Sequence, residues 1–124
     1  MPLLGGEAAG WGTFRFHAGP LRERVLADAV MIGEIPAQTF EEEAVVRFLC
    51  DRFTEEDLDR IATDEVLNAT GVLQGTEGRL NILVAARVDS IWHRSIDHTI
   101  TVTADSLIGP GIADNALGAA CLTT

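Results

Sequence analysis

The stretch Asn81-Ile-Leu-Val-Ala-Ala-Arg-Val-Asp-Ser90 decides the predicted fold, together with the glycine-rich stretch Gly109-Pro-Gly-Ile-Ala-Asp-Asn-Ala-Leu-Gly118. The apolar run over residues 82–88 is typical of a buried strand, and it delivers Asp89 to a loop. The turn after Leu107 delivers Asp114 to the start of a helix. Two carboxylates are therefore predicted to converge at the ends of a strand and a helix.

The composition is that of one acidic domain, or part of one. The chain has 124 residues, of which 47% are hydrophobic, so it can bury one core but is short for a catalytic α/β enzyme. Its 19 acidic residues against nine Lys and Arg give a net charge of −10. No basic patch could outweigh that field, so we expect neither nucleic acid nor an anionic membrane surface as a partner.

The two cysteines and the apolar runs bear on location. Cys50 and Cys121 lie far apart in apolar-periodic segments, which favours buried free thiols over a disulfide or a thiol metal site. We therefore expect a reducing, cytoplasmic location. The longest apolar runs are strand-sized, well below the roughly 20 residues that a membrane span needs.

Residues 1–20 are expected to be a flexible leader, and residues 21–124 to form the domain. The leader lacks a basic start and is interrupted by glycines, so it does not have the pattern of a signal peptide. Its aromatic residues Trp11, Phe14 and Phe16 are candidates for docking on the domain.

Helical patterns fill the first half of that domain. Over residues 21–32 apolar side chains recur at three- and four-residue spacings, which predicts an amphipathic helix that Gly33 ends. A capping-box pattern beginning at Thr39 predicts a second helix over about residues 40–52. A similar pattern at 54–57 predicts a short helix near 58–62.

Strand patterns follow. Residues 65–74 alternate loosely, 75–78 carry a turn signal and 80–88 are strongly apolar, so we expect a hairpin whose second strand is buried inside a sheet. Residues 99–103 predict a third strand. A loop over 105–114 and the beginning of a helix over 115–124 complete the expected order.

Five segments of this chain carry a resemblance to a known family. They are Gly33-Glu-Ile-Pro-Ala-Gln-Thr-Phe-Glu-Glu-Glu43, Asp64-Glu-Val-Leu-Asn68, Gly71-Val-Leu-Gln-Gly75, residues 82–90 and residues 107–118. In this order and spacing they resemble the N-terminal third of the co-catalytic zinc peptidases and deacylases, the family of aminoacylase, acetylornithine deacetylase, peptidase T and glutamate carboxypeptidase. The resemblance implies a three-layer α/β/α sandwich on a mixed, mostly parallel sheet, with two zinc ions above the strand ends.

The resemblance also implies roles for three residues. Asp89 matches the catalytic-site Asp of a His-x-Asp motif that orients a zinc-binding His, and Asp114 matches the metal ligand that bridges both zinc ions. The position of that His is Arg87 here. A guanidinium has no free lone pair and stays protonated, so Arg87 cannot bind zinc. We expect it to form a charge-assisted pair near Asp89 and Asp114, in the space that zinc would otherwise fill.

Other interpretations of these residues stay open. His93 and His98 could supply substitute zinc ligands, although histidines on a polar loop are more often surface residues. Asp114 stands beside Asn115 in a glycine-rich turn before a helix, a place where Asp commonly serves as an N-cap or a turn former.

The reaction that the resemblance implies is metal-assisted amide hydrolysis of small peptides or N-acyl amino acids. The family's general base and remaining zinc ligands have no counterpart up to Thr124, so we expect a truncated, degenerate member that is nearly inert alone. Two alternatives stay open: a non-catalytic binding module that dimerises or pairs with another chain, and the first part of a longer, active hydrolase. An open sheet edge and an uncovered apolar face would favour the binding module.

Overall fold

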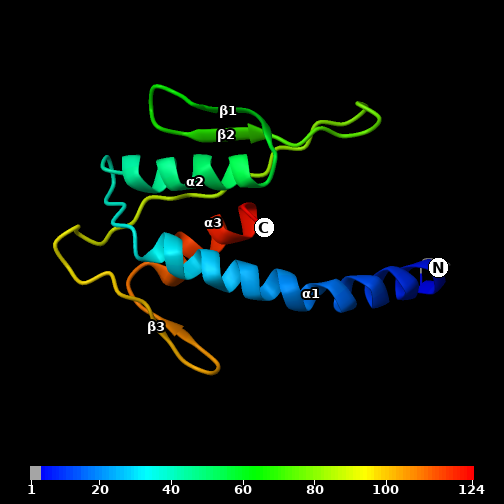
Figure 1. Ribbon diagram of the computed structural model, residues 1–124, viewed down its shortest axis with the longest axis horizontal. Helices are drawn as coiled ribbons and strands as arrows, with labels where there is room; N and C mark the ends of the chain where they lie inside the picture. Colours follow the sequence, from blue (N-terminus) through cyan, green and yellow to red (C-terminus); the bar gives the residue numbers. More distant parts are fainter. Residues whose placement is uncertain (1–3) are drawn as a thin grey trace.

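The computed structural model describes the backbone of residues 4–124 and the side chains of residues 19–124. In that part of the chain the helices are α1 (Leu4–Gly33), α2 (Glu43–Glu55) and α3 (Leu117–Leu122), and a π-helical turn, η1 (Ile112–Ala116), precedes α3. The strands are β1 (Asp59–Thr63), β2 (Ala69–Val72), β3 (Thr101–Val102) and β4 (Leu107–Ile108). Figure 1 shows α1 as a long rod, with α3 and then α2 beside its C-terminal half.

The predicted three-layer α/β/α sandwich with a mostly parallel sheet is wrong. The described strands form two separate sheets of two antiparallel strands each, β1 with β2 and β3 with β4. The parallel contact within residues 4–124 is an isolated bridge between Gln38 and Ser90. A parallel sheet requires several adjacent strands with both faces covered, and the described residues do not supply them.

The first helix ends as predicted but begins much earlier. Gly33 is the last residue of α1, as expected for a helix over residues 21–32, and helical backbone also includes residues 4–20 of the expected leader. The proposed docking of Trp11, Phe14 and Phe16 concerns side chains outside the described residues. No helix in the part of the chain that the structure describes combines the length and apolarity needed to cross a bilayer.

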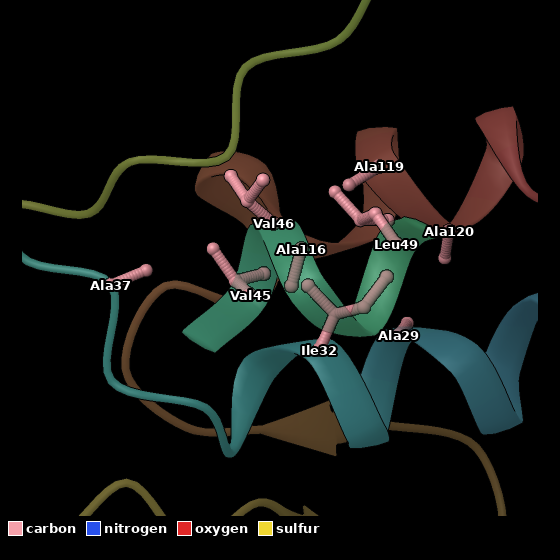
Figure 2. Close-up of a cluster of buried hydrophobic side chains, with 9 residues drawn as sticks. All are labelled: Ala29, Ile32, Ala37, Val45, Val46, Leu49, Ala116, Ala119 and Ala120. Atoms are coloured by element: carbon pink, nitrogen blue, oxygen red, sulfur yellow. The ribbon is translucent and has the colours of Figure 1, made fainter. Parts of the chain in front are cut away.

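The hydrophobic core lies where α1, α2, η1 and α3 meet, and Figure 2 shows that its side chains are mostly small. Alanines allow helices to approach closely, because the distance between helix axes depends on the side chains at the contact. The core is therefore a helical one. Its buried members are Ala29, Ile32, Ala37, Val45, Val46, Leu49, Ala116, Ala119 and Ala120.

A buried ion pair joins α1 to α2. The carboxylate of Asp28, which is 5% exposed, lies 2.7 Å from a terminal guanidinium nitrogen of Arg52. It also accepts a hydrogen bond of 3.1 Å from the Thr123 hydroxyl. A buried charge is tolerated only while it is paired and hydrogen-bonded, so these contacts are essential to the packing of the two helices.

The start of α2 differs from the predicted capping box. The helix begins at Glu43, and its N-cap residue Glu42 makes no side-chain cap hydrogen bond. The Glu42 carboxylate instead accepts a hydrogen bond of 2.8 Å from the backbone N–H of Phe40, while the Thr39 hydroxyl donates to Asp89 at 3.3 Å. A contact fifty residues away along the chain has therefore replaced the local cap.

The short helix predicted near residues 58–62 is also wrong, because those residues form β1. Asp64 turns the chain into β2: its carboxylate accepts hydrogen bonds from the backbone N–H groups of Val66 (3.0 Å) and Asn68 (2.8 Å). Asp side chains commonly make such turns by bonding to backbone two residues further on. This turn lies inside residues 65–74, which were expected to be one strand of a hairpin with 80–88.

The later elements agree with the sequence in part. The strand predicted over residues 99–103 is reduced to β3, and α3 lies within the helix predicted over 115–124. The predicted loop over 105–114 is interrupted by β4 and by the start of η1. Both cysteines are free, but neither is buried as expected, because Cys50 is half-buried and Cys121 is exposed.

The segment expected to be the inner strand, residues 80–88, forms no strand. Figure 1 shows the chain leaving β2, running outward to a turn and returning as an extended trace that passes between α2 and α3. Ala86 and Val88, near the end of this trace, pack against the helical core. The preceding part stays exposed, and we call residues 73–84 the arm.

Candidate carboxylate site

The site begins where the extended segment leaves the core. Arg87 and Asp89 are two positions apart, so in an extended chain their side chains lie on the same side. The Arg87 Nε donates to Asp89 Oδ1 and its Nη2 to Oδ2, each at 3.1 Å. The expected pair between these two residues is thus present, with the two-point geometry that a guanidinium and a carboxylate favour.

This contact perturbs both groups. Hydrogen bonding to Arg87 lowers the pKa of the Asp89 carboxyl from its ordinary value, and Thr39 contributes in the same direction. The hydrogen bond to Asp89 raises the pKa of the Arg87 guanidinium, and the negative charges of Asp89 and Asp114 raise it further. Both groups are therefore held in their charged forms.

Backbone contacts fix Asp89 beside the N-terminal half of the domain. The N–H of Ser90 donates to the carbonyl of Ala37 at 2.7 Å, next to the bridge between Gln38 and Ser90. The Thr39 hydroxyl reaches Asp89 from that neighbouring segment. This second partner of Asp89 was not predicted, because the capping-box pattern had assigned Thr39 to a local role.

Asp114 comes to the site on η1. Gly111, immediately before η1, has a φ of 72°, in the left-handed region that glycine adopts at little cost. The side-chain amide of Asn115 donates to the backbone carbonyl of Arg87 at 3.1 Å, which anchors the turn to the extended segment. The negative charge of Asp114 acts on the Arg87 guanidinium in the same direction as that of Asp89, since it too raises the pKa of Arg87.

The two histidines occupy a neighbouring loop. His93 Nδ1 is 2.7 Å from the Ser95 hydroxyl. The His98 ring is buried and donates from Nε2 to the backbone carbonyl of His93 at 3.2 Å. His98 also lines a cavity of about 20 Å³ together with Asp89 and Asn115, which is enough room for about one water molecule.

The donor set does not fit zinc. Among the residues that the structure describes, no group of three or more His, Cys, Asp and Glu side chains could hold a metal ion. Arg87 is a donor only, and it occupies both carboxylate oxygens of Asp89. A zinc ion at this place would have to displace the guanidinium, and the described residues around it offer no set of three ligands to hold the ion.

A groove borders the site on the side of residues 36–44. It has a volume of about 540 Å³, and its lining mixes apolar and charged side chains, among them Phe40, Leu67, Arg47 and Arg94. Arg94 pairs with Glu41 at 3.2 Å and so connects the loop after Asp89 with the segment before α2. The volume is in the range of small-molecule sites.

Comparisons with known proteins do not assign this site. No model of a protein family matches the chain, and no curated protein matches it.

Proposed function

We propose that this chain is a degenerate member of the zinc peptidase and deacylase family, corresponding to the first part of its catalytic domain, with Arg87 in place of a zinc ligand. The observation that carries the proposal is the two-point contact between Arg87 and Asp89, at 3.1 Å for each bond. The cation of Arg87 compensates the charge of two carboxylates that the family uses around zinc. The assignment depends on these residues and not on the sheet of that family.

The ancestral reaction in this proposal is amide hydrolysis of a small peptide or an N-acyl amino acid. That reaction requires a metal to acidify water and to polarise the carbonyl, and a base to accept the proton. Arg87 supplies neither function, because a guanidinium is always protonated. What the site retains is a guanidinium held beside a carboxylate in a fixed geometry. In this proposal the chain therefore binds a small peptide or an N-acyl amino acid without hydrolysing it.

The expected location in this proposal is the reducing environment of the cytoplasm. Cys50 and Cys121 are both free thiols. Free cysteines persist where cellular reductants keep them reduced.

Zinc titration calorimetry tests the proposal. The wild type should show no zinc binding, whereas Arg87→His should bind zinc, because it restores an imidazole beside Asp89 and removes the guanidinium. Adding Asp114→Ala to Arg87→His should abolish that binding. Arg87→Ala is the matched control, since it opens the space without adding a ligand. Equal zinc binding by the wild type, Arg87→His and Arg87→Ala would refute the substitution of metal by arginine.

Activity gives a second test. With short N-acyl amino acids and dipeptides, the chain supplied with zinc should hydrolyse no faster than zinc alone. Hydrolysis above that blank that disappears in Asp114→Ala would mean that a working metal site exists, and it would overturn the proposal.

A second candidate function, a dimerising module, is favoured by one specific observation. Leu83, in the arm, is 92% exposed, and its apolar neighbours are exposed as well. Contiguous exposed apolar surface is characteristic of interaction sites.

A further inference from the structure

The arm exposes apolar side chains at successive positions. Ile82, Leu83 and Val84 are 76%, 92% and 67% exposed, and Leu73 and Leu80 are exposed as well. Successive side chains of an extended chain point to opposite sides, so both faces of the arm are apolar. A strand with two apolar faces is typical of the interior of a sheet, yet this one lies outside the core.

The backbone of the arm is also open. Among the described residues, the N–H and C=O groups of residues 80–84 make no hydrogen bond to other backbone groups. A row of unpaired backbone groups on an extended, apolar segment is a template for another strand. The occupant that fits both the side chains and the backbone is therefore an extended apolar strand.

Two features of the chain identify that strand. Figure 1 shows the arm projecting away from the helices, so its outer part can meet another molecule without rearrangement of the core. The arm contains one acidic and one basic residue, Glu77 and Arg79, and so has no net charge, whereas the rest of the chain carries the whole net charge of −10. Two copies of this acidic chain therefore repel each other least when they approach through this segment.

We propose that the arm pairs with the arm of a second copy, as antiparallel strands with Ile82 opposite Ile82 across a two-fold axis. In this register Leu80 lies opposite Val84 and Asn81 opposite Leu83, so residues 80–84 are all used. A two-fold contact of this kind closes on itself and gives a dimer. The proposal is independent of the zinc assignment, because it involves neither Asp89 nor Asp114.

The charges at the ends of the segment select this register. Centring the pair on Leu83 would place Arg79 directly opposite Arg87, and like charges directly opposite are unfavourable. Centring it on Asn81 would place Gly78 opposite Val84, and Gly78 belongs to the turn, with a φ of 63°. Centring it on Ile82 places Arg79 opposite Ala85, so residues 79–85 pair without like charges opposite each other and without Gly78.

Sedimentation equilibrium is the first test. Because two five-residue strands bury less than a standard interface of about 1,600 Å², the expected result is a reversible, concentration-dependent dimer. Higher salt should strengthen it by screening the repulsion between two copies of net charge −10. The double variant Ile82→Asp/Leu83→Asp should be monomeric with an unchanged helical circular dichroism spectrum. A strictly monomeric wild type, a dimer that weakens with salt, or a dimer that survives the double variant would overturn the proposal.

Disulfide trapping tests the register. In a background of Cys50→Ser and Cys121→Ser, Ile82→Cys should form a covalent dimer on mild oxidation, because directly opposed Cβ atoms lie roughly 4.5–5.5 Å apart. Val84→Cys, the matched control on the same face, would be displaced from its own copy by four residues, or about 14 Å. It should crosslink only when mixed with Leu80→Cys. Equal crosslinking of Ile82→Cys and Val84→Cys alone would overturn the register.

These outcomes are separable from those of the zinc experiments. The arm variants leave Arg87 and its carboxylate partners unchanged, and the Arg87 variants leave residues 80–84 unchanged. A monomeric wild type would refute the dimer without bearing on the arginine pair. Zinc binding by the wild type would refute the replacement of zinc by Arg87 without bearing on the dimer.

Discussion

Apolar residues are buried in the helical core and exposed in the arm. In the core, Val45 and Ala29 are completely buried between helices, whereas in the arm Ile82 and Leu83 are exposed to solvent. Both regions are apolar in sequence. They differ in how the backbone is satisfied, because a helix forms its hydrogen bonds within one segment and a strand needs a neighbour.

The two regions differ in whether the described residues supply what each region needs for burial and hydrogen bonding. The helices α1, α2 and α3 bury their apolar faces mainly against one another, and loop and extended residues such as Ala37 and Val88 complete the core. The arm has an apolar sequence suited to a strand, but the described residues provide no partner for residues 80–84. We therefore expect stability to reside in the core and association to reside in the arm.

The largest expected effect is on the ion pair within the core. Arg52→Ala removes the partner of Asp28 and leaves a buried carboxylate uncompensated, so the free energy of unfolding should fall by about 3–5 kcal/mol. Urea unfolding followed by circular dichroism measures this. Arg47→Ala is the matched control, because Arg47 pairs with Glu43 on the exposed face of the same helix and should cost only about 0.5 kcal/mol. Equal losses for the two variants would contradict the comparison.

Truncating one leucine in each region sharpens the contrast. Leu49 is 2% exposed, and Leu83 is 92% exposed. Leu49→Ala leaves a cavity and should lower the free energy of unfolding by about 2–5 kcal/mol, whereas Leu83→Ala should change it by no more than about 0.5 kcal/mol. Urea unfolding at a protein concentration low enough to exclude association measures both. A large loss for Leu83→Ala would mean that the arm is part of the folded core.

A smaller effect is expected where the extended segment is anchored to η1. Asn115→Ala removes the hydrogen bond to the Arg87 carbonyl, and the free energy of unfolding should fall by about 0.5–1.5 kcal/mol. Asn81→Ala, in the exposed arm, is the control and should leave unfolding unchanged. Indistinguishable urea midpoints for the two variants would argue against this anchor.

The smallest effect concerns pH. Hydrogen bonding to Arg87 lowers the pKa of Asp89 in the folded chain, so Asp89 binds a proton less readily folded than unfolded. Its contribution to stability is therefore present above the unfolded pKa of roughly 3.9 and is lost as the pH falls through the folded pKa. An NMR titration that follows the side-chain carboxyl carbon of Asp89 should give a titration midpoint below that value. Arg87→Gln should raise this midpoint. Identical midpoints in the two proteins would show that Arg87 does not perturb Asp89.

Local patterns predicted the features that depend on neighbours in sequence. The end of α1 at Gly33 followed from apolar spacing and a helix-breaking glycine. The pair between Arg87 and Asp89 was expected because the resemblance places a cation where a zinc ligand would stand, and the two side chains, two positions apart on an extended segment, lie on the same side. In each case the interacting groups are within a few residues of each other, so the sequence contains the whole interaction.

Patterns failed where a distant residue competes with a local one. Thr39 bonds to Asp89 instead of capping α2, and residues 59–63 pair with β2 instead of forming a helix. Nothing within a few residues of these segments signals such contacts. His98 was likewise expected at the surface, and its ring is buried, because packing around the loop covers it.

By itself, the sequence determined the acidic charge, the main helices and the short-range arginine–carboxylate pair, since these depend on composition and on neighbours along the chain. Only the tertiary structure decided that the apolar run over residues 80–88 forms no inner strand and that its first half is exposed. The physical reason is that an apolar pattern specifies a need for burial but not what supplies it. A strand obtains its hydrogen bonds and its cover from other segments, and their positions are set by the folded chain as a whole.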